Sequence, residues 1–322
     1  MADKAVTTRF GKICMGECPF GVLAKLYIGL EMIVSPDIRH QLEEGKEKMM
    51  TQTLPFYQLD AFASKTFEGN QACVMPLEAY LPDETLQAIA AENNVAETAF
   101  IVPAGEGRWE LRWFTPVVEV PLCGHATLAS AHVIFAHLGF EGAQVTFQTR
   151  RSGELYVSRT AEGYEMDFPA SPVKEIAVTD EMEAALGARP AQMWAGSFLA
   201  CLFETAEEIR ALRPDHKALS ILGADDGDWE RGNIGCLALG GKDSADVTSR
   251  FFAPGSGIDE DPATGSWHCM LAPVIAARFG KTRLNCFQAY AGRGAWIGTE
   301  LAGARVKLSG QAVTVIEGVF RV

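Results

Sequence analysis

The clearest pattern in the sequence is a helix that is apolar on every side. Over residues 126–138 the apolar positions fall all around a helical wheel instead of forming one stripe, and a helix of this kind is buried inside a protein. Gly124 and His125 stand in its first turn, where amide N–H groups have no partner within the helix and the helix dipole is positive. The pattern predicts a buried helix whose start can bind a carboxylate.

A later stretch of the chain repeats this arrangement. The matching blocks are residues 112–116 (RWFTP) with 250–254 (RFFAP), and residues 123–139 with 264–280. Gly124 then corresponds to Gly265. Because chance rarely produces two such blocks in register, we infer an internal duplication with two buried helices. Their N-termini can face one another across a cleft between domains, which suits a small acid.

Short alternating segments around both helices predict strands. They lie at residues 56–62, 72–75, 97–102, 109–114, 144–149, 154–158, 164–168, 198–203, 234–239, 283–290, 295–297, 304–308 and 312–316. Further helices are predicted near residues 82–93, 180–186 and 207–212. The sequence therefore predicts an α+β protein of two similar domains, each a sheet wrapped around one apolar helix.

Composition and charge narrow the class of protein. With 322 residues, 48% of them hydrophobic, the chain can form two domains with substantial cores. Its formal charge of 28 − 41 = −13, without clustered Lys and Arg, argues against nucleic acid as a partner. No run approaches the roughly 18 apolar residues of a membrane span, and no convincing secretory signal occurs. We therefore expect a cytoplasmic protein that does not bind a membrane.

The sequence offers no familiar cofactor or metal motif. The eight cysteines are scattered, without the Cys-x-x-Cys spacing of zinc and redox sites. Cys14 and Cys18 lie four residues apart, but no second pair nearby completes a tetrahedral site. A phosphate-binding loop, a nucleotide fingerprint and a Ser-His-Asp arrangement are also lacking. We therefore expect catalysis without a cofactor or a metal.

Several short motifs, in order, resemble the PhzF-like phenazine-biosynthesis isomerases. They are DAF at 60–62, GN at 69–70, ETAF at 97–100, FTP at 114–116, CGHAT at 123–127 and EDPATGS at 260–266. The resemblance covers residues 55–322. It implies the diaminopimelate-epimerase-like fold, in which each domain is a curled, mainly antiparallel sheet and the active site lies between the domains. It also implies a homodimer. On this basis we expect domains at 53–170 and 171–309, with the last strand, about 310–322, joining the first domain.

The resemblance also implies roles for individual residues. Glu97 would be the general acid and base, with His125 and Asp261 as its catalytic companions. The substrate would be bound by Asn70, Gly124, Gly265 and Ser266. Without the motifs, Glu97 reads as a surface carboxylate, His125 as a helix-start residue, and Asp261 as part of a solvated acidic turn.

The duplicated positions bear on the reaction. Related racemases use one thiol from each half, but here Cys123 corresponds to Thr264, and Thr is too weak an acid to serve as a second base. A one-base reaction on a small carboxylic acid is therefore favoured, either isomerisation by moving a proton within the substrate or a related epimerisation or dehydration. The other class of function is a metabolite-binding protein that kept the cleft without turnover.

Residues 1–52 do not resemble the rest and are interpreted as an N-terminal extension. Residues 43–50 (EEGKEKMM) are rich in residues with purine-rich codons, which suggests a translated ribosome-binding region. We expect the natural start at Met49 or Met50. The alternative is an amphipathic helix docked on the body of the protein, and mass spectrometry of the native N-terminus distinguishes the two.

Overall fold

The computed structural model describes residues 52–223 and 231–322, and Thr53–Val322 form one compact unit. Residues 1–51 lie outside the described residues, and with them the predicted extension and both expected start sites, Met49 and Met50. Within the described part of the chain, no helix is long and apolar enough to cross a membrane.

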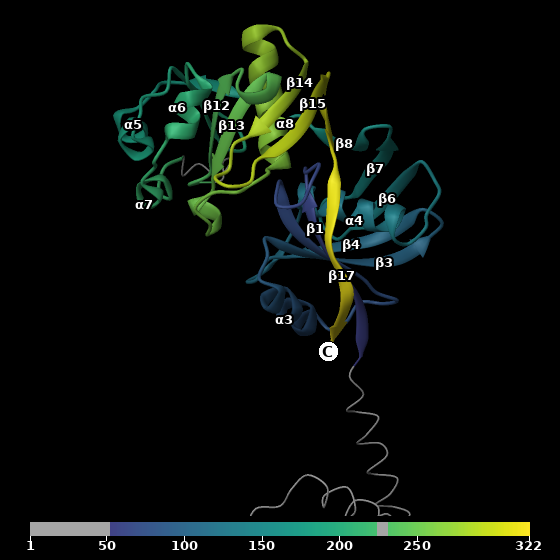
Figure 1. The fold of residues 1–322 in the computed structure, drawn as a ribbon. Coiled ribbons are helices and arrows are strands. Elements are labelled where there is room, and N and C mark those ends of the chain that lie inside the picture. The colour runs from purple at the N-terminus through teal and green to yellow at the C-terminus, as the bar shows by residue number, and fades with distance from the viewer. Residues whose placement is uncertain (1–51, 224–230) are drawn as a thin grey trace, which may run out of the picture. The chain divides into compact units, whose positions relative to one another are not determined.

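The first half of this unit is a sheet around helix α4 (Gly124–Ala136). Its strands, in order of pairing, are β17 (Ala312–Arg321), β1 (Thr53–Ala61), β2 (Asn70–Pro76), β3 (Glu97–Gly105), β4 (Arg108–Phe114), β6 (Gln144–Thr149), β7 (Glu154–Thr160) and β8 (Gly163–Pro169). The short strand β5 (Glu119–Val120) pairs with β4. Helix α4 contacts β17 and β1 as well as β8, so the sheet curls around it (Figure 1).

The second half is built in the same way around helix α8 (Gly265–Phe279). Its strands, in order of pairing, are β9 (Lys174–Ile176), β10 (Gln192–Ala195), β11 (Leu199–Leu202), β12 (Ile234–Leu239), β13 (Val247–Phe252), β14 (Arg283–Gln288), β15 (Ala295–Ala302) and β16 (Arg305–Gly310).

Parallel and antiparallel strand pairings follow one another in the same order in both halves. In the first, β2–β3 and β4–β6 are parallel pairs, and in the second, β11–β12 and β13–β14 are the corresponding parallel pairs. The other pairings along each half are antiparallel. Helix α4 follows β4 and β5, and α8 follows β13. The predicted α+β architecture of two similar halves, each a mainly antiparallel sheet around a buried helix, is therefore confirmed.

The chain that runs from β16 into β17 and one strand pairing join the halves. Strand β17 returns along the whole of β1, from Thr53 opposite Arg321 to Ala61 opposite Ala312, and it occupies beside β1 the place that β9 occupies beside β10. Strand β8 pairs antiparallel with β16, so the sheet continues from one half into the other. The last strand, coloured yellow in Figure 1, lies against the first strand, coloured purple.

Both central helices are buried, as their patterns predict. In α4 the residues from His125 to Ala131 are all buried, and α8 buries most of its length, from Trp267 to Ile275. Helix α8 continues through Pro273 to Phe279. These helices have no polar face because sheet surrounds them, and burial of their side chains supplies much of the hydrophobic stabilisation of each half.

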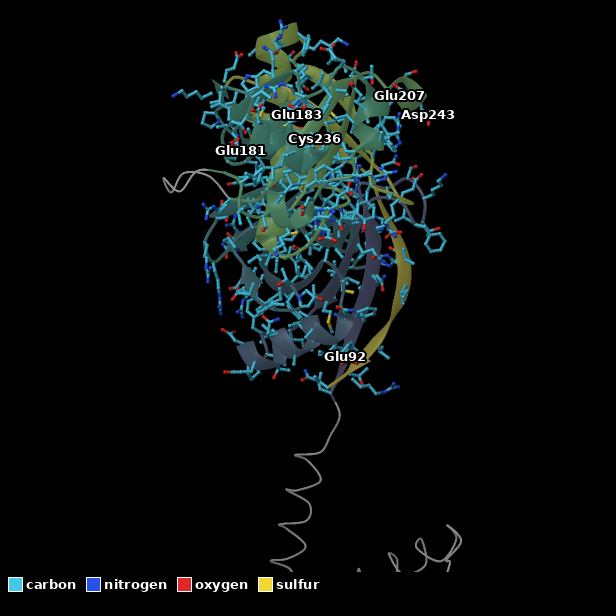
Figure 2. The ribbon with its side chains drawn as sticks, turned by 90° about the vertical axis from the view of Figure 1, so that its left-hand side faces the viewer. Glu92, Glu181, Glu183, Glu207, Cys236 and Asp243 are labelled. Carbon is cyan, nitrogen blue, oxygen red and sulfur yellow. The ribbon has the colours of Figure 1, made fainter. Side chains whose placement is uncertain are left out.

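The other helices lie on the outside of the sheets and have a polar side. They are α3 (Asp83–Asn93), α5 (Asp180–Leu186), α6 (Ala206–Ala211) and α7 (His216–Leu219). Figure 2 shows Glu92 of α3, Glu181 of α5 and Glu207 of α6, which are exposed, whereas Cys236 of β12 is fully buried. Much of the net negative charge is thus carried by the outer helices.

The structure extends or adds several elements. Strand β17 reaches Arg321, although alternation predicts only residues 312–316, because Glu317 and Gly318 interrupt the pattern while pairing with β1 continues. The sequence pattern also missed β9 and β10, which are short, and helix α7. Tertiary pairing rather than local pattern defines these segments.

Candidate active site

The two buried helices begin against one another. A Cβ atom added to Gly124 would lie 3.7 Å from the Gly265 Cα, an ordinary contact distance, so the two helix starts lie close together. The N-cap residues, Cys123 and Thr264, are extended, and neither side chain caps its helix. The first-turn amide groups of both helices therefore lie close together without side-chain caps. Uncapped amide groups of this kind favour the binding of an anion.

Glu97 and His125 meet beside this junction. Glu97 is the first residue of β3, and its Oε2 lies 3.0 Å from Nε2 of His125 in the first turn of α4. The Glu97 side chain is 18% exposed and that of His125 is 7% exposed. Oε2 itself is covered, and among the described residues it receives no hydrogen bond of good geometry. The contact is a close ion pair that leaves this oxygen available for a proton.

Asn70 links the first half to the second. Its side-chain amide, at the start of β2, donates to Oδ1 of Asp261 over 2.7 Å and to the carbonyl of Ala263 over 3.3 Å. The same nitrogen lies 3.4 Å from Nδ1 of His125. Thr264 donates from Oγ1 to the other Asp261 oxygen over 2.6 Å. These hydrogen bonds bring Asp261 to the His125 side of the junction.

Burial and charge shift the pKa values of His125 and Asp261. Burial lowers the pKa of His125, but the interactions of its ring with Cys123 and Glu97 outweigh burial and hold this pKa well above its ordinary value. Burial raises the pKa of Asp261 to about 6, against the opposing effects of His125 and of the hydrogen bond from Thr264. The site therefore favours a positive imidazolium and contains a carboxyl group that titrates near neutral pH.

Cys123 is a neutral thiol in these surroundings. Burial and the Glu97 carboxylate raise its pKa to about 11, although His125 acts in the opposite sense. Its Sγ lies 3.5 Å from Nδ1 and 3.9 Å from Nε2 of His125. The duplicated position holds Thr264, whose hydroxyl is committed to Asp261. The two matching positions at the helix starts therefore provide one thiol, at Cys123, and not one thiol from each half.

The predicted site residues are largely brought together. Glu97, His125 and Asn70 come from the first half, Asp261 comes from the second, and Gly124 and Gly265 form the helix junction. Ser266 is also in the first turn of α8, but it is exposed and takes no part in the hydrogen bonds of Asn70, Asp261 and Thr264.

Sequence reasoning missed Gln288, which supports the second helix start. Its side-chain Oε1 accepts from the Thr264 backbone over 2.9 Å, and its Nε2 donates to the Asp261 carbonyl over 2.7 Å and to Thr264 Oγ1 over 3.0 Å. Gln288 ends strand β14 and is fully buried. A polar residue at an inward position of a predicted strand was the available signal.

A second missed residue, Arg293, holds the loop before Asn70. It donates to Oδ1 of buried Asp60 over 2.5 Å and to the carbonyls of Glu68 and Gly69 over 2.6 and 2.9 Å. Asp60 also accepts from the Phe67 backbone over 2.7 Å. The DAF motif thus supplies a support for the loop, whereas Arg293 had no motif to identify it.

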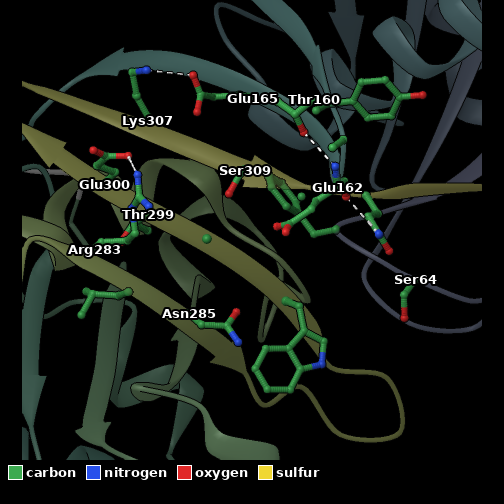
Figure 3. A pocket seen from close by; sticks show the side chains of 18 of the residues that line it. Ser64, Thr160, Glu162, Glu165, Arg283, Asn285, Thr299, Glu300, Lys307 and Ser309 are labelled. Atoms are coloured by element: carbon green, nitrogen blue, oxygen red, sulfur yellow. Dashed lines mark hydrogen bonds and ion pairs between the residues drawn. The ribbon is translucent and has the colours of Figure 1, made fainter.

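A cavity of about 910 Å³ lies elsewhere, along β14, β15, β16 and the β7–β8 turn (Figure 3). Charged side chains on its wall pair with one another, Arg283 with Glu300 at 2.6 Å and Lys307 with Glu165 at 3.0 Å. The predicted site residues, all of which lie in the described part of the chain, do not line this cavity. We therefore place the candidate site at the helix junction.

Three ligand-type atoms are close together at the junction. Side-chain atoms of Glu97, Cys123 and His125 all lie within 4.8 Å of one another, a spacing that a metal ion can bridge. Glu97 is distant from the other two residues in the sequence, and Cys123 and His125 do not have the spacing of a familiar metal-binding motif. The sequence alone therefore does not indicate this cluster.

Comparisons with known proteins agree with this architecture. The sequence profile of the PhzC-PhzF family, described as phenazine biosynthesis-like protein, matches residues 59–318. An uncharacterized isomerase of Pseudomonas aeruginosa is 45% identical over 269 residues, which cover 83% of this chain and 98% of the relative. The solved structure of a PhzF-family phenazine biosynthesis protein from Enterococcus faecalis is 37% identical, with a TM-score of 0.78, and the match covers 84% of this chain and 99% of that chain.

A more distant structure shows how widely the fold is used. A probable proline racemase from Agrobacterium radiobacter, solved with bound carbonate, is 9% identical, with a TM-score of 0.55 over 82% of this chain and 92% of that chain. At this identity the likeness concerns the fold alone. Together with the Enterococcus structure it confirms the predicted diaminopimelate-epimerase-like fold class.

Proposed function

This chain belongs to the PhzC-PhzF family of phenazine biosynthesis-like proteins, and we propose that it moves a proton within a small carboxylic-acid substrate without a cofactor. Its class, an isomerase, agrees with relatives from Pseudomonas aeruginosa and Halalkalibacterium halodurans that are named isomerases and are 37–45% identical to it. Beyond the isomerase class, we propose the class of substrate and the residue that carries the proton.

The observation that carries the proposal is the environment of Glu97. Its Oε2 is covered, lacks a well-aligned hydrogen bond within the described residues, and lies 3.0 Å from His125 Nε2. It stands beside two helix starts without side-chain caps. A substrate carboxylate at the helix starts would be held by amide groups, and its carbon atoms would lie near a carboxylate able to accept a proton.

In the proposed reaction, the Glu97 carboxylate removes a proton from one carbon of the substrate and returns it to another. The double bond moves between these carbons, so the proton count of protein and substrate is unchanged. His125, whose Nε2 lies 3.0 Å from the Glu97 Oε2, holds the Glu97 side chain in position. Asp261, held by Asn70 and Thr264, orients the substrate or adjusts the charge around Glu97.

The test is proton exchange in deuterated water with candidate acids. Glu97→Gln keeps the size of the side chain but cannot accept a proton, so turnover and solvent exchange should fall by about 10²- to 10⁴-fold. Glu92→Gln, the same change on an exposed glutamate of α3, is the matched control. We expect Asp261→Asn to have a smaller effect and Cys123→Ser a smaller one still.

Two outcomes would contradict this proposal. If Cys123→Ser abolished exchange while Glu97→Gln left it intact, the thiol would be the proton carrier. If the unaltered protein bound an acid but exchanged no substrate C–H, the chain would be the metabolite-binding protein that is the alternative function. A product with inverted configuration, or loss of water from the substrate, would indicate the related epimerase or dehydratase reaction.

We extend the proposal to a cytoplasmic location and a homodimer. Both are supported by the family resemblance. Exposed apolar side chains on β17, Ile316 at 47% and Val319 at 56%, are further support for association between chains.

A further inference from the structure

The proton-transfer proposal leaves a buried thiol beside Glu97 and His125 unused. Cys123 lies at the N-cap of α4, next to the carboxylate and the imidazole that the mechanism uses. We infer that Glu97, Cys123 and His125 together bind a divalent transition-metal ion of the zinc class, and that the bound ion blocks proton transfer. The blocking rests on the proposed function, whereas the binding does not.

The donor set is typical of such an ion. Carboxylate oxygen, imidazole nitrogen and thiolate sulfur are the protein ligands of zinc, with bonds of about 2.0–2.3 Å. In a tetrahedral site these bonds place ligand atoms roughly 3.3–3.8 Å apart. Here Glu97 Oε2 lies 3.0 Å from His125 Nε2, and Cys123 Sγ lies 3.9 Å from the same nitrogen. Because Sγ also lies 3.5 Å from Nδ1, it stands beside the ring and not in line with the Nε2 lone pair. Metal binding therefore requires the Cys123 or His125 side chain to turn, which brings three ligand atoms that are already within 4.8 Å of one another onto one ion.

The fold holds these ligands in place. Glu97 begins β3, which is paired on both sides by β2 and β4, and Cys123 and His125 flank Gly124 at the start of the buried helix. The start of this helix lies close to that of α8, at Gly124 and Gly265. Three ligands carried close together on fixed backbone reduce the ordering that binding would otherwise require.

Binding also satisfies a group that the protein leaves unsatisfied. Glu97 Oε2 is buried without a well-aligned hydrogen bond in the described part of the chain. A bond to the metal would give this oxygen the partner it lacks. Three protein ligands leave a fourth position for water or a substrate oxygen. On binding, the Cys123 thiol proton is released to solvent as the sulfur–metal bond forms, and His125, if protonated, releases its extra proton. No electron is transferred.

The bound ion and the proposed proton carrier exclude one another. An oxygen that donates its lone pair to a metal cannot accept a substrate proton with it. Zinc should therefore inhibit exchange reversibly, and a chelator should restore it. Because the ligands include a thiolate, magnesium and calcium, which prefer oxygen ligands, should inhibit far less.

Cobalt provides a direct test with the full-length protein. Co²⁺ bound by a thiolate gives a sulfur-to-cobalt charge-transfer band, and we expect one such ion per chain, displaced by Zn²⁺. Cys123→Ser should abolish the band and weaken zinc binding by more than the about 10- to 100-fold that changes outside the ligand set cause. Circular dichroism checks that the variant is folded, and His125→Asn serves if it is not.

Controls separate this site from other thiols. Cys14→Ser/Cys18→Ser and Cys236→Ser should retain the band, because they alter cysteines outside the cluster. Absence of a thiolate band, or its loss in either control rather than in Cys123→Ser, would overturn the inference. So would a thiolate-bound ion that left exchange unchanged. Failure of the metal-free protein to exchange substrate protons would instead refute the proposed function, while the cobalt spectrum still decides metal binding.

Discussion

Two carboxyl groups of the candidate site differ because of what surrounds each. Asp261 receives hydrogen bonds from Asn70 and Thr264, which fix its orientation. Glu97 faces His125 and keeps an oxygen without a well-aligned hydrogen bond among the described residues. A carboxylate held on both oxygens suits positioning, and one with an available oxygen suits proton transfer. The surroundings thus assign different parts to two chemically similar groups.

At the residue scale, Asp261 predicts a dependence of stability on pH. Its pKa is raised to about 6 in the folded protein from an ordinary value of 3.8. The folded state therefore binds more protons than the unfolded state between these values, and this contribution to stability is lost as pH rises from about 4 to about 6. The change should be on the order of 3 kcal/mol. Urea unfolding across this range measures it.

Asp261→Asn is the control for this dependence. An amide does not titrate, so the variant should lose this part of the pH dependence and retain the contributions of other groups. If the unaltered protein and Asp261→Asn showed parallel stability curves between pH 4 and pH 6, the raised pKa of Asp261 would be refuted.

At the scale of elements, each buried helix is preceded by the same buried ion pair. Arg112 donates through two nitrogens to Glu119, with both distances 2.8 Å, and Arg250 donates in the same way to Glu260, with both distances 2.7 Å. Each glutamate lies four residues before its helix N-cap, Cys123 or Thr264. Both halves therefore retain a buried Arg–Glu pair, called a clamp below, that fixes the loop leading into each helix.

Breaking one clamp should destabilise the protein strongly. Glu260→Ala leaves the Arg250 guanidinium, whose side chain is only 10% exposed, without its charged partner. Loss of one partner of a buried pair costs about 3–5 kcal/mol. The free energy of unfolding in urea measures this cost. We also expect slower exchange, because residues 260–264 carry Asp261 into the site.

Glu300→Ala is the matched change in an exposed pair. Glu300 pairs with Arg283, whose side chain is 78% exposed, and exposed pairs contribute little because water screens them. We expect little change in unfolding for this variant. Equal losses in the two variants would show that the Arg250–Glu260 pair does not act as a buried clamp.

At the scale of the whole molecule, the site depends on both halves of the duplicated fold. Asn70 and Asp261 are hydrogen-bonded although 191 residues separate them in the sequence. The halves are joined by the β8–β16 pairing, and β17 ties the end of the chain to β1. An intact sheet is therefore needed to place the two helix starts together.

The predicted homodimer is tested at this scale. Sedimentation of the protein at micromolar concentration should give twice the 34.9 kDa mass of one chain. Burial of the exposed apolar residues of β17 is one physical reason to expect association. A stable monomer at this concentration would contradict the prediction.

Patterns in the sequence were enough to predict the buried helices, the duplication and most of the candidate site residues. A helix that is apolar on every side is stable only in the interior of a protein, and this pattern can be recognised in a short stretch of sequence. The repeated blocks identified Gly124 and Gly265, and the short motifs pointed to Glu97, His125 and Asp261. These features were predictable because each is encoded within a few neighbouring residues.

Contacts between side chains that are distant in the sequence became apparent only from the folded structure. The Arg293–Asp60 contact spans 233 residues, and Gln288 supports Thr264 from the end of a different strand. Glu260, which sequence patterns interpret as part of an exposed turn, is instead a buried partner of Arg250. Periodicity reports which face of an element is buried but not what packs against it. The supports of the site and its cluster of metal-ligand atoms therefore arise from the pairing of the two halves.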